Sequence, residues 1–234
     1  AAERSIIDSA MGGDFFKRVQ GVMAIYGNYA ASNPLYAEFG VTDGGQSINT
    51  IFTKHTFDWG FAGRVEYKIM GDWSAYRDFT AKDTKKDLLV VGGGADWSQA
   101  GNGNLLHGTV DVQWEGTAGL GAYGAILIQN ADDTFTGLAD DTTNIGLLAQ
   151  VNYLFDPSWD AFGRFDMVTL DNDVVFPSGD TEDTFYELTV GIKRYLGPNG
   201  SWKHNAKFTL DVSFLPNGSP AAFTGQDVLD ANDG

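Results

Sequence analysis

The chain has 234 residues, a formal net charge of −16, 30 glycines, 13% aromatic residues and no cysteine. This length accommodates one large all-β domain or two small domains. The negative charge argues against nucleic acid as a partner, and the lack of cysteine excludes disulfides, thiolate metal sites and cysteine nucleophiles. No apolar run reaches the roughly 18 residues that a membrane-spanning helix needs.

Alternation of apolar and polar residues is the main pattern along the chain, and it is the primary sequence signal of a β-strand. In residues 57–69 (FDWGFAGRVEYKI), the odd positions are mostly aromatic or aliphatic, while Arg64, Glu66 and Lys68 occupy even positions. In chain order, the pattern predicts strands at about 19–30, 34–42, 57–69, 88–98, 106–115, 119–129, 145–153, 159–169, 185–196 and 206–214. An all-β, antiparallel fold of about ten strands is therefore expected.

The segments between the strands alternate in length. Short helical turns are expected at 5–11 and within 73–86. Short, turn-rich connectors are found at 32–34, 115–119, 156–158 and 197–201. Longer polar loops are found at 43–55, 131–144 and 171–183, and 98–104 is intermediate. Short turns on one side and long loops on the other are typical of a transmembrane barrel, although the long connector 70–86 breaks the alternation.

The apolar face of these strands has two possible environments, the core of a soluble sandwich or the lipid around a membrane barrel. The strands are about 10–13 residues long, against a usual length of about 5–6. Small residues also lie at mid-strand on this face, where a soluble core needs volume. These residues are Gly63, Gly108, Gly124, Ala149 and Gly163.

Aromatic residues gather near the strand ends, as in the two girdles of a membrane barrel. They are Trp59, Tyr67, Trp97, Trp114, Tyr153, Trp159, Tyr195, Phe208 and Phe214. The sequence therefore favours a transmembrane β-barrel whose polar face lines a wet lumen. The alternative is a soluble or surface-layer β-sandwich with a binding or structural role.

Four segments resemble bacterial outer-membrane porins, specifically the phosphate-selective porin O and P family. They are 4–27, 57–73, 150–171 and 185–218, a little under half of the chain. The resemblance implies a homotrimer of barrels with about 16 or 18 strands each and an aqueous channel. Residues 1–234 would then be a single porin domain that lacks strands at both ends, with 216–234 as an extracellular-type loop. Closure of ten strands into a complete barrel is the alternative.

Charged residues on the polar parity of the strands are the candidate lining of the pore. They are Arg64, Glu66, Lys68, Asp96, Asp111, Glu115, Arg164, Asp166, Glu187, Lys193, Lys207 and Asp211. Glu38 and Asp58 add to the acidic side, and an excess of carboxylates favours cations. Within single strands, Arg64–Glu66–Lys68 and Arg164–Asp166 are expected to pair and to fix side chains and register.

The expected function is passive diffusion of small hydrophilic solutes or ions, with a mild cation preference, across a bacterial outer membrane. No enzymatic activity, catalytic residue or cofactor is expected. The expected partners are the bilayer and its lipopolysaccharide-type lipids, the solutes, and further copies of the chain in a homotrimer, but not nucleic acid. Loop 43–55 is a candidate for folding inward because it contains few acidic residues.

Other motifs fit simpler explanations. The run VVGGGADWS (90–98) lacks the Lys–Ser/Thr pair of a phosphate loop, so its glycines are expected to mark a bend or a close backbone approach. Asp171 and Asp173 are candidates for weak Ca²⁺ binding in a loop without the EF-hand pattern, and no other metal site is expected. His107 lies near Ser98 and Asp111 in sequence but is expected to face the lumen rather than to form a catalytic triad. His55 and His204 have no metal-ligand spacing.

Overall fold

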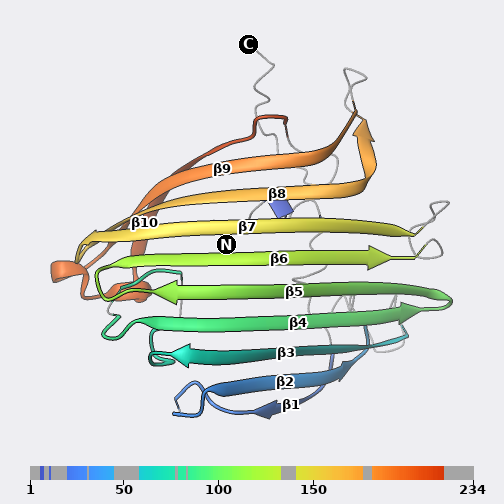
Figure 1. Ribbon diagram of the computed structural model, residues 1–234, viewed down its shortest axis with the longest axis horizontal. Helices are drawn as coiled ribbons and strands as arrows, with labels where there is room; N and C mark the ends of the chain where they lie inside the picture. The colour runs from blue at the N-terminus through green and yellow to red at the C-terminus, as the bar shows by residue number, and fades with distance from the viewer. Residues whose placement is uncertain are drawn as a thin grey trace.

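The computed structural model describes residues 6–7, 11, 20–30, 32–44, 58–76, 79–82, 84–132, 141–175 and 181–218. Within them, ten strands form one antiparallel sheet in which each strand pairs with its neighbours in sequence (Figure 1). The strands are β1 (Gly21–Tyr26), β2 (Leu35–Thr42), β3 (Trp59–Met70), β4 (Leu88–Ala100), β5 (Gly103–Glu115), β6 (Leu120–Ala131), β7 (Thr142–Asp156), β8 (Trp159–Val175), β9 (Thr181–Tyr195) and β10 (Lys207–Phe214). The all-β antiparallel prediction is confirmed.

The connections differ from the sequence expectation in three places. The predicted loop at 98–104 is wrong, because β4 continues to Ala100 and β5 begins at Gly103, which leaves a two-residue turn. The predicted loop at 171–183 is too long, because β8 continues to Val175 and β9 begins at Thr181. Gly101 has φ +60, a left-handed conformation that glycine adopts without strain. Between β9 and β10, the connection includes two short 3₁₀ turns, Pro198–Gly200 and Lys203–Asn205.

Tight turns at 116–119 and 157–158 lie at one end of the sheet, which we call the short-turn end. Connector 71–87, between β3 and β4, lies at the same end, whereas the 101–102 turn lies at the opposite end. The strand register shifts near the ends of strands, between Lys68 and Met70 and between Leu154 and Asp156, and also between Thr169 and Val174. Elsewhere the pairing is continuous, so each strand keeps one set of residues on each face.

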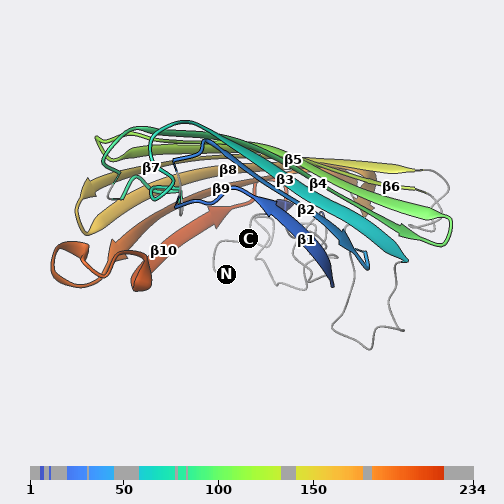
Figure 2. The same cartoon turned by 90° about the horizontal axis from the view of Figure 1, so that it is seen from below.

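The sheet is curved, as the second view shows (Figure 2). We call the face that carries Arg64, Asp111 and Glu187 the polar face, and the face that carries Val65, Val110 and Val190 the apolar face. The helical turn at Ile6–Ile7 packs on the polar face, which is the concave one. Since the described residues form a single sheet, they contain no second layer to cover the apolar face as a sandwich would.

The N-terminal turn predicted at 5–11 is present in its described residues, because the Met11 N–H donates to the Ile7 carbonyl at 2.9 Å. Ile6, Ile7 and Met11 form a buried cluster with three polar-face residues of β8 and β9, namely Val168, Leu170 and Phe185. The Ile6 N–H donates to Glu187 Oε2 at 2.8 Å, and Gln129 Nε2 donates to the Met11 carbonyl at 3.0 Å. Within the described residues, no helix is long and apolar enough to cross a membrane.

Replacing Gly146 by valine is expected to displace this N-terminal turn. A Cβ at Gly146 would lie 2.7 Å from Ile7 Cγ2 and 3.2 Å from Met11 Sδ, whereas a Cβ at Gly163 on the neighbouring strand meets nothing within 4 Å. Overpacking of this kind costs about 1–3 kcal/mol. We expect Gly146→Val to lose hydrogen-exchange protection at the Ile6 amide and Gly163→Val to keep it. Equal protection in the two variants would contradict the packing described.

Candidate functional site

The two faces of the sheet reverse the usual distribution of charged and aliphatic residues. Val110, Val190 and Val212 on the apolar face are 66%, 65% and 68% exposed, while Glu115 and Asp166 on the polar face are 0% exposed. Water-soluble proteins rarely bury carboxylates or expose continuous aliphatic surfaces. The apolar face therefore suits a nonpolar environment such as lipid.

Aromatic side chains lie on the apolar face near both ends of the strands. At the end opposite the short turns, Trp59 lies edge-on to Trp97, with ring centroids 5.0 Å apart, and Phe61 stacks on Trp97 at 6.1 Å. At the short-turn end, the Arg194 guanidinium lies 5.2 Å from the centre of the Trp159 ring. The expectation for Tyr195 is wrong: its side chain is buried on the polar face, where its hydroxyl donates to Thr80 Oγ1 at 3.0 Å.

All twelve predicted pore-lining residues lie on the polar face. The pairing of β3, β4 and β5 puts Arg64, Glu66, Lys68, Asp96, Asp111 and Glu115 on this face, and the pairing of β8, β9 and β10 does so for Arg164, Asp166, Glu187, Lys193, Lys207 and Asp211. Asp160 of β8 shares this face and is fully buried, but the sequence analysis did not select it. The role of these residues as a pore lining remains a prediction.

Arg64 is the centre of the first charged cluster. Its Nε lies 2.6 Å from Glu66 Oε1, and its Nη1 lies 2.8 Å from Asp111 Oδ2. The second contact joins β3 to β5 across the intervening β4. A Cβ at Gly92 of β4 would lie 2.5 Å from Arg64 Nη2 and 2.9 Å from Asp111 Oδ1. The glycine run in β4 therefore leaves room for an ion pair that crosses a strand.

Two tyrosines complete this cluster by donating hydrogen bonds to Glu66. The Tyr29 hydroxyl donates to Oε2 at 2.5 Å, and the Tyr76 hydroxyl donates to Oε1 at 3.1 Å. Burial and then the charge of Glu66 raise the pKa of Tyr76 above its ordinary value. Tyr76 therefore stays protonated and remains a hydrogen-bond donor at neutral pH.

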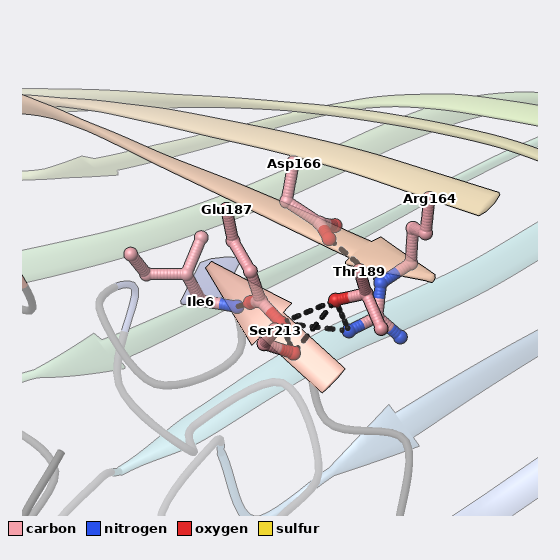
Figure 3. Close-up of polar contacts among 6 residues, drawn as sticks. All are labelled: Ile6, Arg164, Asp166, Glu187, Thr189 and Ser213. Atoms are coloured by element: carbon pink, nitrogen blue, oxygen red, sulfur yellow. Dashed lines mark hydrogen bonds and ion pairs between the residues drawn. The ribbon is translucent and has the colours of Figure 1, made fainter. Parts of the chain in front are cut away.

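Arg164 is the centre of the second charged cluster, which joins β8, β9 and β10 (Figure 3). Its Nε lies 2.7 Å from Asp166 Oδ2, and its Nη2 lies 3.1 Å from Glu187 Oε1. The hydroxyls of Thr189 and Ser213 each donate to Glu187 Oε1 at 2.8 Å. Both predicted intrastrand pairs, Arg64–Glu66 and Arg164–Asp166, are thus present.

Lys68 is placed differently from the other charged residues of β3. Its Nζ lies 5.3 Å from the centre of the Trp73 ring, so a cation–π contact holds its ammonium group. On β9, the Lys193 Nζ is held in a similar way, 4.6 Å from the centre of the Phe162 ring.

The remaining candidates form neither a catalytic triad nor a metal site among the described residues. His107 is buried on the polar face, with Nε2 3.0 Å from Gln129 Nε2 and Nδ1 3.9 Å from Asp96 Oδ1. Ser98 donates to Asp96 at 3.3 Å, while Asp111 is bound by Arg64.

The proposed calcium ligands are described only in part. Asp171 Oδ2 accepts a hydrogen bond from the Thr143 N–H at 3.0 Å. The side chains of Asp173 and His204, together with residues 45–57 and 219–234, lie outside the described residues. Weak Ca²⁺ binding at the Asp171 loop therefore stays a prediction.

The sequence predicts a short helical turn within 73–86, but the described residues of connector 71–87 form turns without a helix and contact the polar face. Its Trp73 Nε1 donates to the Asn33 carbonyl at 2.7 Å, and its Thr84 hydroxyl donates to Glu115 Oε2 at 2.6 Å. The signals that could have revealed this placement are the length of the connector at the short-turn end and its aromatic residues, since an aromatic-rich segment seldom stays in solvent.

The curved single sheet, its exposed aliphatic face and its charged concave face define a porin-like β-barrel protein. Residues 20–229 match the family described as "Putative beta-barrel porin-2, OmpL-like", and the chain belongs to this family. A search of curated proteins and a search of solved structures each find no match. The porin-like class is confirmed, whereas the narrower resemblance to the phosphate-selective porin O and P family is not confirmed by this match.

Adding a side chain at Gly92 is expected to break the contact between Arg64 and Asp111. Gly92→Val would place atoms in the space that the ion pair occupies, at a cost of about 1–3 kcal/mol. Gly93→Val is the matched control, because its Cβ on the apolar face has no neighbour closer than 3.4 Å. Urea unfolding in detergent micelles measures the free energy of unfolding of both variants. A smaller loss of this free energy in Gly92→Val than in Gly93→Val would contradict the placement of the Arg64–Asp111 ion pair over Gly92.

Proposed function

We propose that the protein is a passive pore of the bacterial outer membrane, through which small hydrophilic solutes and ions diffuse. The observation that carries this proposal is the reversed distribution of residues between the two faces. An apolar outer belt with aromatic ends and a polar, charged inner face are the physical requirements of a water-filled barrel in lipid. The porin-like family supports a channel without enzymatic activity.

The charges on the polar face support a mild preference for cations. Each arginine of the two clusters contacts two carboxylates: Arg64 contacts Glu66 and Asp111, and Arg164 contacts Asp166 and Glu187. Each cluster therefore has an excess of negative charge, to which Asp96 adds. Carboxylates along a pore attract cations and repel anions.

The barrel is proposed to be larger than this sheet. Among the described residues, β1 and β10 each pair on one side alone, and lipid does not tolerate an open strand edge. Further strands at both ends, in a barrel of about 16 or 18 strands, would satisfy these edges, and pairing of β1 with β10 is the alternative. In keeping with the porin resemblance, the assembly is proposed to be a homotrimer in contact with lipopolysaccharide-type lipids.

Single-channel recording in a planar bilayer tests the pore. The protein is purified in detergent from its native membrane and examined in a KCl gradient. Stepwise, ohmic conductance with a reversal potential of the cation-selective sign is expected. Folded, membrane-extracted protein without conductance would overturn the pore, and an anion-selective sign would overturn the cation preference alone.

Neutralising single charges on the polar face is expected to shift the reversal potential in opposite directions. Asp96→Asn should reduce the cation preference and Lys207→Gln should increase it, because each removes one charge of known sign from the lining. Arg194→Gln is the control, since Arg194 lies over Trp159 on the apolar face. Equal shifts from Lys207→Gln and Arg194→Gln would show that the polar face does not line the conducting path.

A further inference from the structure

We propose that connector 71–87 is the constriction of the channel. This proposal rests on the proposed pore function. It identifies connector 71–87 as the segment that limits the size of the solutes that pass. The connector begins at the end of β3 and returns at the start of β4, yet its side chains contact strands on the far side of the sheet. A connector that merely joins neighbouring antiparallel strands needs only a few residues.

The first part of the connector is fixed beside β2 and β3. Trp73 is 3% exposed, donates its indole N–H to Asn33, and packs edge-on against Tyr29 with ring centroids 5.2 Å apart. Three residues later, the Tyr76 hydroxyl donates to Glu66 of β3. The entry of the segment into the concave space is therefore held by both aromatic packing and hydrogen bonds.

The described middle residues of the connector, 79–82, contact strands farther along the concave face. Phe79 lies on Tyr123 of β6, with ring centroids 4.1 Å apart, and Thr80 accepts a hydrogen bond from Tyr195 of β9. These partners lie on the polar face of β6 and β9, so the described residues 79–82 lie in the concave space rather than in the wall.

The last part of the connector is also held by contacts with the sheet. Lys82 is 8% exposed, donates to the Pro157 carbonyl in the turn between β7 and β8 at 2.6 Å, and lies 4.9 Å from the centre of the Tyr195 ring. Thr84 then donates to Glu115 of β5. Contacts with strands across most of the sheet favour one fixed position of the segment, so it narrows the lumen permanently at the short-turn end.

A single cysteine at Phe79 tests the constriction. The chain has no cysteine, so Phe79→Cys introduces a unique thiol, and Phe79 is 38% exposed in the middle of the connector. Methanethiosulfonate reagents of similar size and opposite charge are added to open channels. Both are expected to lower the conductance in one step, and the cationic reagent is expected to lower the K⁺ current more, because it adds repulsion to obstruction.

Ala118→Cys is the matched control, because Ala118 is exposed in the 116–119 turn at the same end of the sheet. Its modification is expected to leave the conductance unchanged. Mass spectrometry shows whether Phe79→Cys is modified. If modified Phe79→Cys channels keep an unaltered conductance, the constriction proposal is wrong, while the pore proposal still holds. Absence of conductance in the unmodified wild-type protein would instead overturn the pore itself.

A shortened variant provides the second measurement, in case Phe79→Cys does not fold. Replacing residues 76–84 by a short glycine–asparagine turn removes the middle of the connector and keeps β3 and β4 joined. A larger single-channel conductance and passage of larger neutral polymers are expected. An unchanged conductance and size cut-off in folded, inserted protein would overturn the proposal.

Discussion

The structure depends on one constraint, which is that a single curved sheet presents aliphatic residues outward and charged residues to its concave side. In water, this arrangement would expose a continuous apolar surface and is unfavourable. In lipid it is favourable, but the charges on the concave side then have to be balanced by one another. The two arginine clusters meet this requirement in part, since each guanidinium binds two carboxylates, and hydroxyl groups donate to the carboxylates of Glu66 and Glu187.

The register of the strands maintains this separation of faces. A slip by one residue would turn Arg64 and Glu66 to the apolar face and Val65 to the concave face, so every ion pair across strands opposes such a slip. The Arg64–Asp111 contact is effective because it fixes β3, β4 and β5 together, and Gly92 is the position that permits it. Glycine lowers strand propensity, but at position 92 it allows the side chains of Arg64 and Asp111 to meet across β4.

The sequence predicts what depends on period-two alternation and fails where distant segments meet. Strands, faces and the pairs Arg64–Glu66 and Arg164–Asp166 follow from residues two positions apart. The Arg64–Asp111 pair could not be predicted, because it joins β3 to β5 and depends on the register of three strands. For Tyr195, the strand-end position predicts an aromatic girdle, whereas the parity it shares with Lys193 predicts the polar face; the parity is correct, because the side chain is buried there.

The N-terminal turn and connector 71–87 contact different parts of the concave face. The N-terminal turn covers polar-face residues of β7, β8 and β9, and connector 71–87 covers the short-turn end. Beside β2 to β5, the described residues form a hollow whose lining includes Gly40, Ala62, Gly94, Asp96 and His107. Small residues leave space on this part of the concave face, and the Asp96 carboxylate supplies negative charge there. In a pore of the proposed kind, solutes would therefore pass along the β2–β5 side of the sheet, where small residues leave space and the Asp96 carboxylate is accessible.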